Sequence, residues 1–90
     1  IAEYGDPFLS TLYPNPNAGT FTLAFVASES QSMEVIITDV SGRILWERDL
    51  GNVFGENREV ISVTDLATGV YFLKLQGENG RSVIRFTIQR

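Results

Sequence analysis

Three features of the sequence predict an all-β domain, folded as an antiparallel seven-stranded β-sandwich of immunoglobulin-like form. Apolar and polar residues alternate along short segments, as over 20–25, where Phe21, Leu23 and Phe25 face one side. Turn-forming residues separate such segments at intervals near ten residues, which is typical of sandwiches. No competing helical periodicity interrupts this pattern.

The length and composition indicate one small folded domain. Ninety residues leave room for little more than a single core. With 43% hydrophobic residues and a mean hydropathy of +0.03, the chain is not typical of a disordered tail. We expect residues 1–8 to be the remnant of a linker and residues 9–90 to form the domain.

The first predicted elements are a short strand over 8–13, anchored by Leu9 and Leu12, and a rigid corner over 13–21. Two prolines fix the backbone of this corner and remove hydrogen-bond donors, so they cannot lie in a paired central strand. An asparagine and a glycine follow, Asn17 and Gly19, and these favour a reversal of the chain.

The middle of the chain is expected to contain a polar connection over 27–32, a strand over 33–38 and a hairpin. In the hairpin, a type I turn followed by Gly42 with positive φ needs that conformation only at glycine. This turn sets Asp39 opposite Arg43 as an exposed ion pair without catalytic meaning.

Turn geometry also predicts the register of two hairpins. The first would pair Ile37 with Leu45 and Ile36 with Trp46. In the second, an Asn-Gly turn at 79–80 would pair Leu75 with Ile84, Leu73 with Phe86, and Tyr71 with Ile88. The same register places Lys74 opposite Arg85, an unfavourable pair that a neighbouring acid would relieve or that is kept positive for a partner.

The remaining elements are a loop over 51–57, a strand over 59–63, a corner over 65–69 and the two strands of the last hairpin. The inward-facing positions of all strands define the expected core: Phe21, Leu23, Phe25, Met33, Val35, Ile37, Leu45, Ile61, Val63, Leu66, Tyr71, Leu73, Leu75, Ile84, Phe86 and Ile88. Some apolar residues are left for the opposite faces: Ile36, Trp46, Val70 and Phe72. They are covered by a loop or neighbouring strand, or they form an exposed partner surface.

Charge is distributed unevenly along the chain. The net charge is −4, but from Lys74 onward four basic residues face a single acid, Glu78. These cations either blunt an exposed sheet edge or form a docking face for an acidic partner. Nucleic acid is not expected as a partner, because the field of the whole domain repels phosphate.

The residue types present argue against an enzyme. Cysteine and histidine are absent, which excludes thiol nucleophiles, histidine bases and ordinary zinc sites. Three carboxylates at predicted turns, Asp39, Asp49 and Asp65, are explained by turn formation and form no dense calcium-binding loop. We therefore expect no catalytic residue, no metal and no cofactor.

Three motifs, in order, resemble those of one protein family. They are Tyr-Pro-Asn-Pro-Asn-Ala-Gly-Thr-Phe at 13–21, Asp-Val-Ser-Gly-Arg at 39–43, and Leu-Ala-Thr-Gly-Val-Tyr at 66–71. Together they are similar to the type A C-terminal sorting domains, or secretion tails, of the type IX secretion system of Gram-negative bacteria. The similarity runs from about Leu9 to Arg90.

The resemblance implies a C-terminal domain that directs an upstream cargo across the outer membrane, from the periplasm to the cell surface or medium. Its implied partners are the outer-membrane translocon with its shuttle protein, and a sortase-like peptidase that usually removes the tail by cutting the upstream linker. By motif match and position at the basic end, the candidate recognition residues are Pro14, Asn15, Pro16, Gly19, Gly42, Gly69, Lys74, Arg85 and Arg90. The family often has alanine at the position of Thr68 and lysine at that of Arg85, which leaves the recognised charge open.

Two other functions remain open. A glycan-binding or adhesive module would use aromatic rings such as Tyr13, Trp46 and Tyr71 for stacking, and a row of coplanar exposed aromatics would favour it. An inert spacer domain of a surface protein would show no exposed apolar patch.

Overall fold

The computed structural model describes residues 7–78 and 80–90, and these form five antiparallel strands. The strands are β1 (Thr11–Tyr13), β2 (Thr20–Thr38), β3 (Ile44–Ser62), β4 (Gly69–Gln76) and β5 (Arg81–Ile88). The all-β antiparallel prediction is confirmed, but the predicted number of seven strands is wrong. Over the described residues there is no helix that could cross a membrane.

Two predicted breaks in the chain are bends within long strands. The polar segment 27–32 lies inside β2, and the segment 51–57 lies inside β3. Pairing between these strands skips from Ala27 to Gln31, which allows the ladder to bend without ending. Gly51 and Gly55 take positive φ, 69° and 78°, on the bent part of β3. Each long strand therefore replaces two of the predicted short ones.

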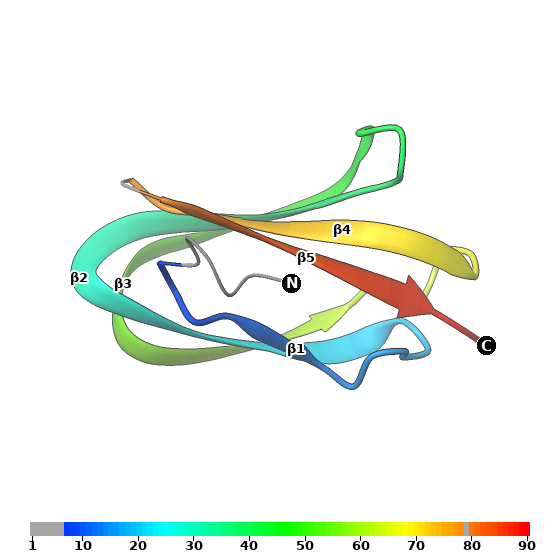
Figure 1. Ribbon diagram of the computed structural model, residues 1–90, viewed down its shortest axis with the longest axis horizontal. Coiled ribbons are helices and arrows are strands. Elements are labelled where there is room, and N and C mark those ends of the chain that lie inside the picture. The colour runs from blue at the N-terminus through cyan, green and yellow to red at the C-terminus, as the bar shows by residue number, and fades with distance from the viewer. Residues whose placement is uncertain (1–6, 79) are drawn as a thin grey trace.

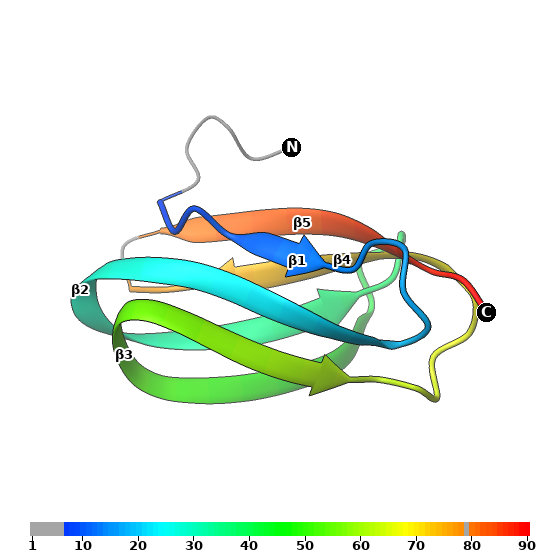
Figure 2. The ribbon, with the colours of Figure 1, turned by 90° about the horizontal axis from the view of Figure 1, so that it is seen from below.

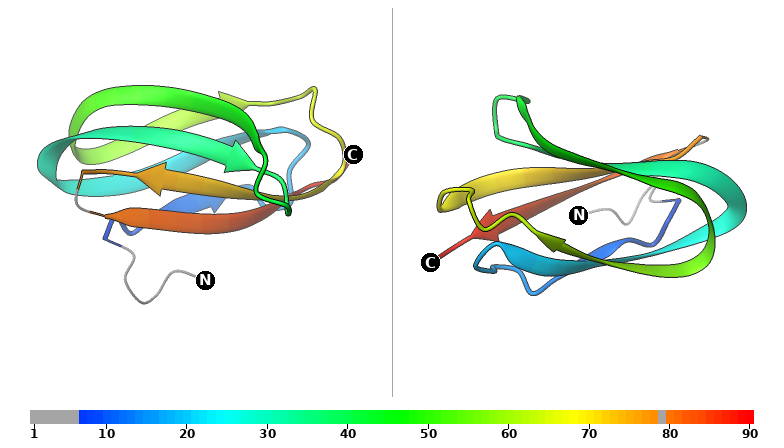
Figure 3. Two further views of the ribbon diagram at one scale, coloured as in Figure 1. Left: turned by 90° about the horizontal axis from the view of Figure 1, so that it is seen from above. Right: turned by 180° about the vertical axis from the view of Figure 1, so that it is seen from behind.

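The five strands form one curled sheet whose two halves face each other (Figure 1). The lower half in Figure 1 contains β1, the first part of β2 and the last part of β3, and Figure 2 shows it from below. The upper half contains the first part of β3, the last part of β2, β4 and β5, side by side in the left view of Figure 3. The core fills the space between the halves.

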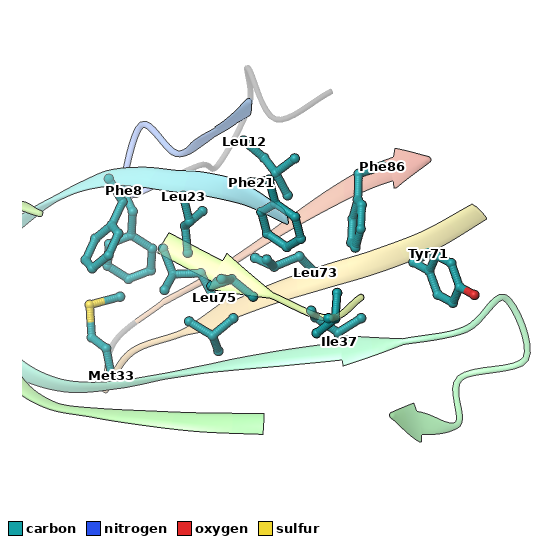
Figure 4. Close-up of a cluster of buried hydrophobic side chains, with 14 of the residues drawn as sticks. Phe8, Leu12, Phe21, Leu23, Met33, Ile37, Tyr71, Leu73, Leu75 and Phe86 are labelled. Atoms are coloured by element: carbon teal, nitrogen blue, oxygen red, sulfur yellow. The ribbon is translucent and has the colours of Figure 1, made fainter. Parts of the chain in front are cut away.

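The predicted core is confirmed except at Leu45, Leu66 and Ile84, which are partly buried and pack against its rim. Its centre brings Phe21 and Phe86 together, with ring centroids 5.0 Å apart (Figure 4). Burying large apolar side chains of this kind stabilises a fold by roughly 1.5–3 kcal/mol each. The inward face of the sheet is thus well described by the period-two pattern.

The entry into β1 differs from the prediction. Phe8, the last residue of the expected linker, is only 2% exposed and packs in the core. Its carbonyl oxygen accepts a hydrogen bond from the backbone N–H of Val26 at 2.8 Å. Leu12 is buried as expected, but Leu9 has positive φ and is 73% exposed, so it is not an anchor of this strand. The predicted linker up to residue 6 lies outside the described residues.

The turn at Gly42 is predicted correctly, but the register beyond it is wrong. Gly42 has φ 92°, and Asp39 exchanges backbone hydrogen bonds with Arg43 and Gly42. A bulge then follows, so that Ile37 pairs with Trp46 and Ile36 with Glu47. Because a shift of one residue reverses the face of every side chain, Trp46 packs against the core instead of joining the outer face.

The register of the final hairpin is also shifted, by two residues. Leu73 pairs with Ile84, Tyr71 with Phe86, Gly69 with Ile88, and Leu75 with Ser82. The N–H of Gly77 donates to the carbonyl of Gly80, so the hairpin closes one position earlier than the predicted turn, of which Asn79 is not among the described residues. Lys74 consequently lies opposite Val83, and the expected like-charge pair with Arg85 does not form.

Candidate recognition surface

The predicted corner at 13–21 lies against the C-terminal part of β5. The peptide bonds before Pro14 and Pro16 are both cis. The side-chain amide of Asn15 donates to the carbonyl of Arg85 at 3.3 Å, and its oxygen accepts the N–H of Thr87 at 3.0 Å. The Asn15 side chain therefore replaces the backbone of a neighbouring strand at this position. It satisfies the carbonyl of Arg85 and the N–H of Thr87, which would otherwise face water.

Asn17 continues this attachment with its backbone. Its N–H donates to the carbonyl of Thr87 at 3.1 Å, and its own carbonyl accepts the N–H of Gln89 at 2.7 Å. Its buried side chain holds the turn, because it donates to the carbonyl of Pro14 and accepts the N–H of Gly19. The corner turns the chain, as predicted from Asn17 and Gly19. It also covers the end of β5, which was not predicted.

The Arg90 side chain is engaged in hydrogen bonds within the domain. Its guanidinium donates to the carbonyl oxygens of Ala18 at 3.2 Å, Leu66 at 2.5 Å and Thr64 at 2.7 Å. A Cβ on Gly19 would lie 2.8 Å from this guanidinium and 3.1 Å from the Cα of Thr64. Arg90 and Gly19 therefore connect the C-terminal end of the chain to two loops, the corner at 13–21 and the β3–β4 connection, and Arg90 presents fewer free donors to a partner than its exposure suggests.

Gly42 lies apart from this cluster, at the tip of the β2–β3 hairpin. The Asp39 carboxylate accepts hydrogen bonds there from the hydroxyl of Ser41 at 2.6 Å and the N–H of Arg43 at 3.0 Å. The predicted ion pair with Arg43 is present at 3.2 Å. These interactions, the Ser41 hydroxyl first, lower the pKa of Asp39 below its ordinary value of 3.8.

Gly69 begins β4 beside the ring of Tyr71. A Cβ at Gly69 would meet that ring at 3.8 Å, an ordinary contact, so nothing in the structure explains a requirement for glycine there. Tyr71 is buried, and its hydroxyl donates to the carbonyl of Ala67 at 2.6 Å. The Leu-Ala-Thr-Gly-Val-Tyr motif therefore fixes the corner that leads into β4.

The other two predicted cations, Lys74 and Arg85, share the outer face of β4 and β5, and Arg81 joins them. Lys74 lies opposite Val83, and Arg81 and Arg85 flank that valine on β5. None of the three is in an ion pair with another described residue. We call Lys74, Arg81 and Arg85 the basic surface. Arg81 was counted among the four basic residues at this end of the chain but was not among the predicted site residues; it lies on the same face of β5 as Val83 and Arg85 because side chains alternate along a strand.

Apolar side chains lie between and beside these cations. Phe72 and Val70 on β4 and Ile36 on β2 are half-buried on the same face, and Val83 is 42% exposed. Three of them, Ile36, Val70 and Phe72, were predicted for the opposite face, whereas Val83 was not, and the predicted Trp46 does not join them. An apolar strip bordered by cations is a surface suited to a partner with acidic and apolar groups.

The same face carries acids at its other margin. Glu34 pairs with Gln76 on one side and Asp49 on the other, and Glu47 pairs with Ile36. The upper half of the sheet is therefore polarised, with cations on β4 and β5 and carboxylates on β2 and β3. In the part of the chain that the structure describes, no group of three or more acidic residues could hold a metal ion.

Comparison with protein families identifies the chain. The family model for the secretion system C-terminal sorting domain matches residues 11–89. The chain belongs to this family. The match confirms the resemblance to type IX secretion tails and includes all three motifs, two of which, at 13–21 and 66–71, hold the ends of β4 and β5 in place. A search of curated proteins found no match to this sorting domain.

Proposed function

We propose that this sorting domain directs a secreted cargo protein across the outer membrane through the type IX secretion system. The observation that carries the proposal is the family match over residues 11–89, which spans every strand of the fold. The cargo would lie upstream and pass through the periplasm to the cell surface or the medium. On its way out of the periplasm, the domain would be recognised by the outer-membrane translocon and its shuttle protein.

The basic surface is the proposed point of recognition. Lys74, Arg81 and Arg85 form the cationic margin of a face on a domain whose net charge is −4. Charge complementarity with an acidic partner would speed encounter and fix orientation, while the half-buried Phe72 would add apolar contact. The partner would therefore recognise the folded domain through this surface.

The domain itself would act as a signal and as a substrate, and not as an enzyme. Removal by a sortase-like peptidase would take place upstream of Phe8, since Phe8 is already packed in the core. The chain has no histidine or cysteine to activate its serines or to act as a nucleophile.

The adhesive alternative finds little support in the geometry. Tyr71 is buried, and Trp46 is half-buried with the guanidinium of Arg48 5.0 Å from its ring centroid. Of the predicted stacking rings, only Tyr13 is largely exposed, at 46%. These three rings therefore do not form the row of coplanar exposed aromatics that would favour a glycan-binding module.

A reporter assay tests the sorting role. Residues 1–90 are fused behind a signal peptide and a fluorescent protein in a host with a type IX system, beside the same reporter without the domain. We expect the fusion at the surface or in the medium and the bare reporter in the periplasm. Retention of the fusion in the periplasm, with the domain shown to be folded, would contradict the proposal.

A further inference from the structure

One edge of the sheet has backbone groups that no described strand pairs. β5 is the last strand in the order β1–β2–β4–β5. The bonds to Asn15 show that Arg85 and Thr87 point their backbone groups away from β4. Because direction alternates along a strand, the N–H and C=O of Val83 and the N–H of Arg85 lie at the same edge. Asn15 and Asn17 cover only the part beyond them.

A groove runs along this open part of the edge, between β1 and β5. Its volume is about 470 Å³, and Ser10 and Thr11 face Val83 and Arg85 across it. The two strands lie near each other and run in the same direction (Figure 2). An extended segment inserted between them could run antiparallel to both. Asn15 bounds the groove at one end.

The other end of the groove is bounded as well. Pro7 packs over the β4–β5 turn, so that a Cβ on Gly80 would lie 2.7 Å from the Cγ of Pro7. The part of the edge that no described residue covers therefore extends from about Arg81 to Arg85. A segment of only a few residues fits there, since each residue of a strand advances roughly 3.4 Å.

The charges beside the groove select the kind of segment. On an added strand, the residues opposite Arg81 and Arg85 would lie on the outer face with those arginines. Glu78, the nearest acid in sequence, instead accepts the N–H of Ser32 at 2.8 Å. Acids at two positions of the added strand would thus meet cations that form no ion pair with another described residue, and an apolar residue between them would lie opposite Val83.

We propose that the edge of β5 from Arg81 to Arg85 binds an extended acidic segment of a partner protein as an added antiparallel strand. The recognised pattern is acid, any residue, apolar, any residue, acid. Backbone hydrogen bonds to Val83 and Arg85 provide affinity, and the cations provide selectivity. The inference rests on the recognition role proposed for the basic surface and specifies how that surface engages its partner.

The test uses the purified 90-residue chain and a capped peptide, Thr-Glu-Thr-Val-Thr-Glu-Thr. We expect saturable binding at low salt with a Kd below about 1 mM. The amide protons of Val83 and Arg85 should exchange more slowly with solvent when the peptide is bound. Absence of binding would overturn the proposal, and so would equal binding of a peptide with lysine in place of glutamate.

Two controls separate strand addition from simple ionic attraction. A peptide methylated on the valine and glutamate backbone nitrogens keeps its charge but cannot donate to β5, and it should bind at least about tenfold more weakly. Val83→Pro removes the outward N–H at an edge position that tolerates proline, and should weaken binding similarly, whereas Val83→Thr should not.

Equal binding of the methylated peptide would overturn strand addition, as would undiminished binding by folded Val83→Pro. Neither outcome concerns the sorting role, because that role is judged by export of the reporter. An experiment that contradicts strand addition at the groove can therefore be told apart from one that contradicts the sorting role.

Discussion

At the scale of single residues, the motif glycines have different roles. Gly19 and Gly42 both have positive φ, 109° and 92°, but only Gly19 is crowded by neighbouring backbone. A Cβ on Gly42 would meet nothing within 4 Å. Gly69 needs neither special backbone nor space. A shared motif residue can therefore be required for conformation, for close approach, or for neither.

Gly19→Ala should destabilise the domain more than Gly42→Ala does. Each change carries the strain of positive φ, roughly 1–2 kcal/mol. At Gly19 the backbone around Thr64 must also move, because the new Cβ would lie 3.1 Å from its Cα. Urea unfolding of the two variants measures the difference, and Gly69→Ala serves as a control that should stay near the parent. Equal losses at Gly19 and Gly42 would contradict this account.

The lowered pKa of Asp39 gives a pH-dependent prediction. A carboxyl whose pKa is depressed in the folded state stabilises the fold above its ordinary value of 3.8, and this contribution is lost as pH falls through the folded-state pKa. Because the Ser41 hydroxyl is the largest cause, Ser41→Ala should raise the pKa of Asp39 toward the ordinary value. An NMR titration of the Asp39 carboxyl measures this. A pKa unchanged by Ser41→Ala would show that the hydroxyl has no such effect.

At the scale of elements, the corner and β5 depend on each other. Asn15 and Asn17 make three hydrogen bonds to the backbone of β5 and a fourth to Gln89, the residue that follows the strand. The sequence predicts a corner made rigid by prolines and a reversal of the chain. It does not predict the attachment to β5, since the partners of Asn15 lie 70 and 72 residues away. Local pattern carries no information about such a distant pairing.

Asn15→Ala should destabilise the domain by about 1–3 kcal/mol, because two backbone groups of β5 lose their partner. The amide of Thr87 should become the most affected, with faster hydrogen exchange than in the parent. Asn15→Asp keeps the acceptor for Thr87 and loses the donor to Arg85, so it should protect Thr87 better than alanine does. Unchanged exchange at Thr87 in Asn15→Ala would contradict the role of the side chain.

The pairing register of the strands was predicted less well than the face of the sheet on which each side chain lies, for a geometric reason. The two-residue shift between β4 and β5 preserves which side chains point inward, so Tyr71, Leu73 and Phe86 remain in the core. The one-residue bulge before Trp46 does not, and Trp46 changes sides. Alternation along one strand predicts burial, whereas pairing depends on the exact turn.

At the scale of the whole molecule, curling decides which edges remain open. Among the described strands, β3 pairs only with β2, and its inward side carries Arg48, which bonds Glu59 at 3.2 Å between the two parts of that strand. Inward-pointing charges of this kind discourage pairing at an edge. The edge of β5 has no such device between Arg81 and Arg85. The sequence could predict seven strand segments but not that two pairs of them join round a bend, because a polar stretch such as 27–32, or one with glycines such as 51–57, usually ends a strand.

The central claim is that the basic surface of a folded sorting domain is read during export, and one matched pair of variants tests it most directly. Arg85→Glu reverses a charge on that surface, and Arg58→Glu makes the same change at an exposed position on β3. Both fusions are compared in the reporter assay after their folding is verified. The account predicts about tenfold less export for Arg85→Glu and parental export for Arg58→Glu. Parental export of folded Arg85→Glu, or equal losses in both variants, would contradict it.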